Sequence, residues 1–196
     1  MNDKQELHFL LSLNLNELRK SRFNHWKSVL GESNKKDILV FGAGELGLKT
    51  INGLLKSGLT PKAILDNRAN DNTSKIFDIP VVTPNKAAQI FDKNNTICLV
   101  SVFNTSAPKR QLKELGFINI IHCVLVFAAM PESFLPYVCL DDTDIIFNNK
   151  SNIIEAYEIM GDITSMQCYI SQLRHRLFLN FDKVLQPQTP EMKESE

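Results

Sequence analysis

Apolar residues in the first two thirds of the chain form short runs that alternate with helical patterns. Runs in which nearly every residue is apolar fit strands that are covered on both faces of a sheet. The strands predicted in this way span residues 37–41, 61–66, 79–82, 96–102 and 117–123. The helices predicted between them span residues 45–57, 84–91 and 106–115. This order of elements predicts an α/β fold with a doubly wound, mostly parallel sheet of about five strands.

The segments on either side of this pattern are predicted to be helical. Residues 8–30 carry apolar side chains at roughly helical spacing, although Asn14 weakens the middle of the pattern. Residues 124–147 indicate short irregular pieces, and residues 151–179 predict two helices joined near Gly161. The sheet is therefore expected to have an N-terminal helix before it and a helical extension after it.

A glycine-rich turn follows the first predicted strand. Gly42, Gly44 and Gly47 match the pattern G-x-G-x-x-G, and Asp66 ends the next strand about 20 residues later. In such turns the first glycine permits the tight bend, the second lets a pyrophosphate approach the backbone, and the third lets the helix pack close to the sheet. The helix N-terminus offers free N–H groups to an anion, and the acid accepts hydrogen bonds from a ribose. The turn therefore predicts a Rossmann-like nucleotide-binding domain.

Other polar residues extend the predicted site. Glu45 and Leu46 lie inside the glycine turn, and Asn67 follows the predicted ribose acid. Ser101 lies at the end of the fourth predicted strand and Asn104 follows it, at the position where ligands of open α/β sheets bind. The structural alternatives are that Asn104 and its neighbours cap the next helix and that the acid forms a turn with Asn67. The predicted cofactor-binding set is Gly42, Gly44, Glu45, Leu46, Gly47, Asp66, Asn67, Ser101 and Asn104.

The pattern divides the chain into four segments. They are an N-terminal helical segment at 1–36, a Rossmann-like domain at 37–123, an irregular and helical extension at 124–185, and a disordered tail at 186–196. The tail is expected to be disordered because it combines Pro187 and Pro190 with a highly charged end.

Composition limits the possible partners and compartments. Lys and Arg total 22 residues, as do Asp and Glu, so the formal net charge is zero and a nucleic-acid partner is not expected. The apolar runs are too short to span a bilayer, and the polar first residues do not form a signal peptide. The four cysteines are scattered, without a C-x-x-C pair, which is typical of reduced thiols in a cytoplasmic protein.

The sequence resembles the N-terminal, Rossmann-like part of FkbM-type methyltransferases. The resemblance covers about residues 37–185 and rests on four stretches, of which the last is the most specific. These stretches are Phe41-Gly42-Ala43-Gly44-Glu45-Leu46-Gly47, Leu65-Asp66-Asn67, Ile79-Pro80-Val81-Val82-Thr83-Pro84, and residues 169–182, which read YISQLRHRLFLNFD. The resemblance implies a Rossmann-like fold related to methyltransferases.

The chain also departs from that family. In the family a second domain with its own glycine-rich signature holds S-adenosylmethionine, whereas this sequence has one glycine-rich loop and ends soon after Asp182. The expectation is therefore the N-terminal Rossmann-like domain without the following methyltransferase domain. The methyl-transfer activity of the family is not carried over to this chain.

Other chemistry-bearing residues leave the catalytic role unassigned. His122 has no recognisable nucleophile or acid partner, and it is interpreted as a half-buried structural residue. Asp141, Asp142 and Asp144 lack the glycine and the distal glutamate of a calcium loop, so no metal site is predicted. Arg174, His175 and Arg176, with Lys183, make the last predicted helix basic, which fits either a solvated face or a contact with an acidic partner.

Three functions remain open from the sequence. The first is a non-catalytic module that binds a nucleotide or a nucleotide-sugar, with NAD(P) as another candidate ligand. The second is an enzyme, either an S-adenosylmethionine-dependent methyltransferase or an NAD-dependent oxidoreductase. The third is a docking subunit of a split enzyme, which would form a homodimer or bind a methyltransferase partner. Its expected contact surface lies at residues 165–182, where Leu173, Leu177 and Phe178 share one helical face.

Overall fold

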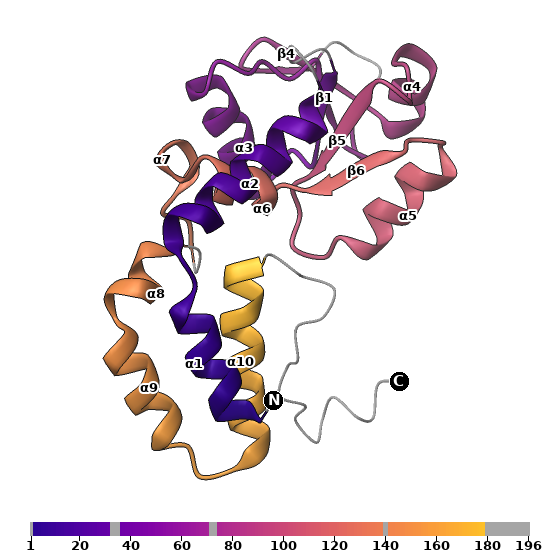
Figure 1. Cartoon of the computed structure of the whole chain (residues 1–196). Coiled ribbons are helices and arrows are strands. Elements are labelled where there is room, and N and C mark those ends of the chain that lie inside the picture. Colours follow the sequence, from indigo (N-terminus) through magenta and orange to yellow (C-terminus); the bar gives the residue numbers. More distant parts are fainter. Residues whose placement is uncertain (1, 32–35, 71–73, 139–140, 179–196) are drawn as a thin grey trace, which may run out of the picture. The chain divides into compact units, whose positions relative to one another are not determined.

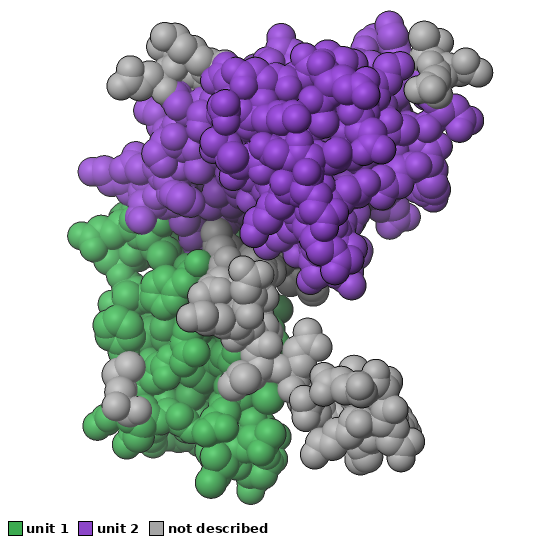
Figure 2. Space-filling view, turned by 90° about the vertical axis from the view of Figure 1, so that its right-hand side faces the viewer, with its two compact units in different colours: residues 1–19, 141–196 green, residues 20–140 purple. Residues whose placement is uncertain are grey.

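The computed structural model describes residues 2–31, 36–70, 74–138 and 141–178. The chain forms two compact units, which Figure 2 shows in different colours. Residues 20–140 form one unit, called here the sheet unit. Residues 1–19 and 141–196 form the other, called here the helical unit. The predicted tail at 186–196 and the residues Phe181, Asp182 and Lys183 lie outside the described residues.

The sheet unit contains one mixed sheet. Its strands are β1 (Asp37–Phe41), β2 (Ala63–Leu65), β3 (Lys75–Ile76), β4 (Ile79–Val82), β5 (Thr96–Val100) and β6 (Asn119–His122). Their spatial order is β3-β4-β2-β1-β5-β6. All neighbouring strands are parallel except β3 and β4, which are antiparallel. The predicted doubly wound, mostly parallel α/β fold is confirmed.

The strand order reverses at β1. From β1 the chain continues through β2 and β4 on one side and through β5 and β6 on the other. Phe41, the last residue of β1, is in register with Leu65 at the end of β2 and with Val100 at the end of β5. The loops that follow these strands therefore meet at one edge of the sheet, at the position where open α/β sheets bind ligands.

Helices cover both faces of this sheet (Figure 1). They are α3 (Glu45–Lys56), α4 (Pro84–Ile90), α5 (Ser106–Glu114), α6 (Val124–Ala129) and α7 (Pro131–Phe134). Ala87 of α4 and Leu112 of α5 pack in one core cluster with Leu39, Phe41 and Val100 of the strands. Figure 1 shows α3, α6 and α7 on the opposite side of the strands. Both faces are buried, which explains why the strands are apolar at nearly every position.

An edge hairpin in this sheet was missed by the sequence pattern. The strands β3 and β4 are joined by Phe77 and Asp78, which have positive φ angles of 51° and 62°. Two-residue hairpin turns with both residues in the left-handed region normally contain Asn or Gly. Because neither residue type occurs at this turn, the local sequence carried no hairpin signal.

The helical unit is built from both ends of the chain. It contains α1 (Asp3–Ser12), the start of α2 (Leu15–Leu30), α8 (Asp144–Asn148), α9 (Lys150–Glu158) and α10 (Ile163–Phe178). Its core is formed by residues of α1, α8, α9 and α10, namely Leu7, Leu10, Leu11, Ile146, Tyr157, Ile170, Leu173 and Leu177. Salt bridges between Lys4 and Glu158 and between Glu6 and Arg174 join α1 to α9 and α10.

The single helix expected at residues 8–30 is two helices. The side-chain oxygen of Asn14 accepts hydrogen bonds from the backbone N–H groups of Asn16, at 2.9 Å, and Glu17, at 3.3 Å. Asn14 therefore starts a new helix instead of continuing the first, because it satisfies the free N–H groups of that new helix. The predicted pair of helices after residue 150 is confirmed, and the Asp162 carboxylate accepts from the backbone N–H of Ser165 at 2.8 Å.

The apolar face of α10 is more covered than expected from the sequence. Leu173 is 7% exposed and Leu177 is fully buried in the core of the helical unit, whereas Phe178 is 48% exposed. Of the two packing alternatives for this face, Leu173 and Leu177 therefore follow the one in which they pack within the chain, and docking through residues 165–182 stays a prediction. They pack with the apolar face of α1, which comes from the far end of the sequence.

Candidate functional site

The loops at the carboxyl edge of the sheet are fixed by ladder hydrogen bonds that extend beyond the strands. The backbone N–H groups of Gly42 and Ser101 donate to Leu65 and Phe41, at 2.8 and 2.9 Å. Those of Asp66 and Cys123 donate in the same way to Val82 and Val100, both at 3.1 Å. The first residues after β1, β2, β5 and β6 are thus brought together at one edge of the sheet. The sequence predicted this position for Gly42, Asp66 and Ser101, which follow β1, β2 and β5.

The three glycines of the turn have different surroundings. Gly42 has a φ of 112°, and a Cβ atom there would lie 2.9 Å from the carbonyl oxygen of Ser101. At Gly47 a Cβ atom would overlap the carbonyl oxygen of Gly42, so α3 packs directly on the turn. At Gly44, in contrast, a Cβ atom would meet no atom of the described part of the chain within 4 Å. Two glycines are therefore required by packing, and the third faces open space.

The N-terminus of α3 has no side-chain cap. Gly44 is its N-cap residue and makes no side-chain hydrogen bond to the first turn. Glu45 is exposed in that turn, whereas the Leu46 side chain is 5% exposed and packs in the core. Leu46 can therefore contribute only its backbone to a ligand, and the N-terminal N–H groups of α3 are available to an anion.

Asp66 is connected to the glycine turn and to Arg68. Its carboxylate accepts hydrogen bonds from the backbone N–H of Ala43, at 3.2 Å, and from the backbone N–H of Arg68, at 2.8 Å. The Arg68 guanidinium pairs with the same carboxylate at 3.2 Å, although the Arg68 side chain is 84% exposed. Burial acts to raise the pKa of Asp66, but the hydrogen bonds from Arg68 and Ala43 together lower it. Asp66 is therefore an ionised hydrogen-bond acceptor at neutral pH.

The lowered pKa of Asp66 predicts a pH dependence of stability. Because the folded-state pKa lies below the ordinary value of 3.8, the ionised carboxylate stabilises the fold. This contribution is complete above pH 3.8 and is lost as the pH falls through that value towards the folded-state pKa. In thermal melts, the stability difference between the parent and Asp66→Asn should be constant near neutral pH and should shrink below about pH 4. A difference that grows in acid would contradict this assignment.

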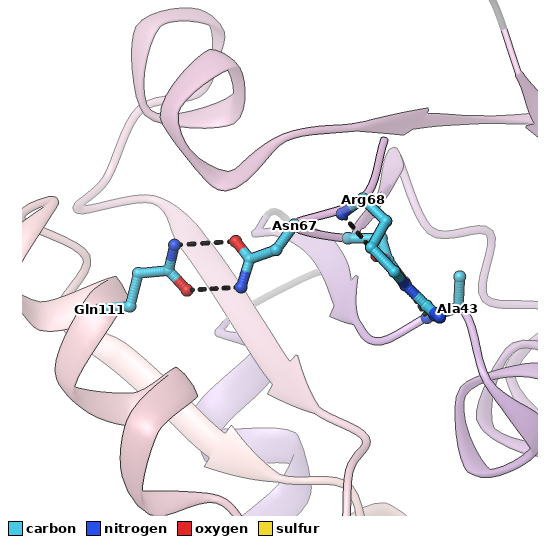
Figure 3. A network of polar contacts seen from close by, with 5 residues as sticks. Ala43, Asn67, Arg68 and Gln111 are labelled. Atoms are coloured by element: carbon cyan, nitrogen blue, oxygen red, sulfur yellow. Dashed lines mark hydrogen bonds and ion pairs between the residues drawn. The ribbon is translucent and has the colours of Figure 1, made fainter. Parts of the chain in front are cut away.

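Asn67 and Gln111 form a reciprocal amide pair. The amide nitrogen of Asn67 donates to the Gln111 oxygen at 3.2 Å, and the Gln111 nitrogen donates to the Asn67 oxygen at 2.9 Å. Figure 3 shows the two planar groups facing each other, with Asn67 on the loop after β2 and Gln111 on α5. The sequence singled out Asn67 but not its partner, because the two residues lie 44 positions apart.

Of two other predicted site residues, Asn104 has a structural role, whereas the buried Ser101 hydroxyl has no hydrogen-bond partner among the described residues. The Asn104 side-chain oxygen accepts from the backbone N–H of Ser106 at 3.2 Å, so Asn104 caps α5. Thr105, the N-cap residue of α5, makes no side-chain hydrogen bond to the described residues of that helix. Ser101 is 2% exposed, and its hydroxyl lies near the Cys123 thiol together with that of Thr50. Burial raises the pKa of the Cys123 thiol to about 11, and these hydroxyls partly oppose the shift.

Lys49 and Tyr137 lie together at this edge and were missed by sequence reasoning. The Lys49 ammonium is 5.9 Å from the centre of the Tyr137 ring, and it donates to the carbonyl oxygen of Pro136 at 3.3 Å. Burial, and then the negative charge of Glu45, raise the pKa of Tyr137. Tyr137 belongs to a segment without periodicity, so no pattern in the sequence indicated its position beside α3.

The remaining candidates have structural partners. Asp142 and Asp144 both pair with Arg19, at 2.8 and 2.6 Å, so one guanidinium offsets part of the negative charge of the acidic loop. The Nδ1 atom of His122 accepts from the backbone N–H of Val124 at 3.1 Å. Among the described residues, no group of three or more His, Cys, Asp or Glu side chains is arranged to hold a metal ion. Cys139 lies outside the described residues.

The described part of the chain contains no helix that is both long and apolar enough to cross a membrane.

Comparison with known proteins identifies one similar fold. No family model matches the sequence, and no curated protein matches it. The crystal structure of methyltransferase FkbM from Methylobacillus flagellatus KT is similar to this chain, with a TM-score of 0.63 and 12% sequence identity. The match covers 85% of this chain and 49% of that chain, so this chain spans about half the length of that protein. The similarity establishes an FkbM-like, Rossmann-type α/β fold.

Proposed function

We propose that the sheet unit binds a nucleotide or a nucleotide-sugar at the carboxyl edge of its sheet. The observation that carries this proposal is the contrast between the three glycines of the turn. Packing explains Gly42 and Gly47, but a Cβ atom at Gly44 would meet no atom of the described residues within 4 Å, so packing against them does not require a glycine there. A glycine that faces open space at an uncapped helix N-terminus permits close approach of a phosphate to the backbone.

Asp66 supplies the second half of this proposal. Its carboxylate accepts a hydrogen bond from the backbone N–H of Ala43, the residue that precedes Gly44 in the glycine turn. The Arg68 side chain is 84% exposed, so solvent screens its ion pair and a ribose diol can displace the guanidinium at little cost. The backbone hydrogen bonds of the carboxylate would stay in place. A ligand that places a phosphate on the glycine turn and a ribose on Asp66 is a nucleotide.

The proposal is tested by calorimetric titration with NAD, UDP-glucose and S-adenosylmethionine. The parent should bind NAD or UDP-glucose, and Gly44→Val should weaken that binding at least about tenfold. This estimate corresponds to losing one or two hydrogen bonds to a charged phosphate, at about 1.5–3 kcal/mol each. Thermal melts should show little change, because the new side chain would point into open space.

Gly161→Val is the matched control, since a Cβ atom there also meets nothing within 4 Å. Gly161 lies in the helical unit, and its variant should bind as the parent does. The proposal fails if the parent binds neither NAD nor UDP-glucose at millimolar concentration. It also fails if Gly44→Val binds with unchanged affinity.

We further propose that this chain corresponds to the Rossmann-like part that precedes the methyltransferase domain in FkbM-type enzymes. This is supported by the resemblance of Phe41–Gly47 to that part and by the match to about half of an FkbM methyltransferase. The titration with S-adenosylmethionine separates the alternatives. Weak or absent binding is expected, whereas tight binding that depends on Asp66 would favour a methyltransferase site in this chain.

A further inference from the structure

We propose that the Asn67–Gln111 amide pair recognises the nucleobase of the ligand. The base would present a hydrogen-bond donor beside an acceptor on one edge, as adenine and uracil do. This inference rests on the proposed nucleotide site and extends it from the phosphate and the ribose to the base.

The position of the pair supports this assignment. Ala43 marks the phosphate-binding turn, Asp66 accepts a hydrogen bond from Ala43, and Asn67 is the next residue along the chain. Figure 3 shows Ala43 and Arg68 at one end and Gln111 at the other, with Asn67 between them. The groups therefore follow one another in the order phosphate, ribose and base.

The elements that carry the pair also point to a ligand. Asn67 follows β2 and Gln111 belongs to α5, which follows β5, so the pair bridges elements from the two sides of β1. Dinucleotides lie across the crevice where the strand order reverses. A base on this side of the sheet would thus reach the Asn67–Gln111 pair and take the place of one of its two amides.

The chemistry of the pair matches that of a base edge. A side-chain amide places one N–H donor beside one carbonyl acceptor, and this arrangement pairs with the amino group and ring nitrogen of adenine. Uracil offers the same pattern through its ring N–H and an adjacent carbonyl. In the ligand-free protein each amide satisfies the other through two hydrogen bonds. A base that replaces one amide would restore the hydrogen bonds that it breaks.

The experiment tests both sides of the contact. Methylation removes the hydrogen-bond donor from the base, and substitution by alanine removes the two side-chain amides from the protein. The probes are ADP with N6,N6-dimethyl-ADP, and UDP with N3-methyl-UDP, titrated into the full chain. One of these two pairs should fit the site of the parent. In that pair the parent should bind the unmethylated nucleotide about tenfold more tightly than the methylated one. The preference should disappear in Asn67→Ala/Gln111→Ala, and the identity of the preferred pair would distinguish adenine from uracil.

Gln89→Ala is the matched control, because it removes an exposed amide from α4 of the same unit. It should keep the preference of the parent. The double variant should keep its affinity for inorganic pyrophosphate, which has no base. The base assignment is overturned if the nucleotides bind but the parent does not prefer the unmethylated forms, or if the preference survives in the double variant. Failure of the parent to bind any nucleotide would overturn the nucleotide site itself, and the base assignment with it.

Discussion

Gly47→Ala is expected to destabilise the sheet unit by about 3 kcal/mol or more. The added methyl group would overlap the backbone carbonyl oxygen of Gly42, which cannot rotate away as a side chain can. Relief requires α3 to move off the turn, and this would open the buried contacts of Leu46 and Ile51. The loss should appear as a lower urea midpoint with an unchanged dependence on denaturant.

Trp26 is a suitable reporter for this experiment. It is the only tryptophan of the chain, lies within the sheet unit and is 1% exposed. Gly44→Ala is the control, because the same methyl group there would meet nothing within 4 Å. Equal unfolding midpoints for the two variants would show that the turn does not have the close packing described above.

Leu177→Ala is expected to destabilise the helical unit by about 2–5 kcal/mol. Leu177 is fully buried in a core that joins α10 to α1, and truncation leaves a cavity that the surrounding helices fill only in part. Hydrogen exchange of the α1 and α10 amides should measure the loss, since the tryptophan reports on the other unit. Phe178→Ala, at a side chain that is 48% exposed, should cost much less.

The same two positions bear on self-association. Homodimer formation through residues 165–182 remains a prediction of the sequence, and of the three side chains on that face Phe178 is the exposed one. Light scattering of Phe178→Asp against the parent would measure its contribution. A change of mass in Leu177→Ala alone would indicate unfolding, because Leu177 is not available to a partner in the folded unit.

The local sequence was sufficient to predict those elements whose conformation depends only on residues within one short segment. The strand at 37–41, the glycine turn and the Thr83–Pro84 helix start follow from residues that act on their immediate neighbours. The Thr83 hydroxyl accepts from the backbone N–H of Lys86 at 3.3 Å, as a capping residue should. The failures have the same origin. Asn14 can interrupt a helix or continue it, and Phe77 adopts a left-handed turn only because β3 and β4 pair around it.

The sequence by itself determined the α/β alternation, the mostly parallel sheet and the glycine turn that leads into α3. These features depend on hydrophobic period and on backbone freedom, which are properties of neighbouring residues. Only the tertiary structure decided that Gly44 alone of the three glycines faces open space, that Asn67 meets Gln111, and that Leu177 is covered by α1. Each of these depends on the packing of elements that are distant in the sequence, and such packing leaves no periodic signal in either partner.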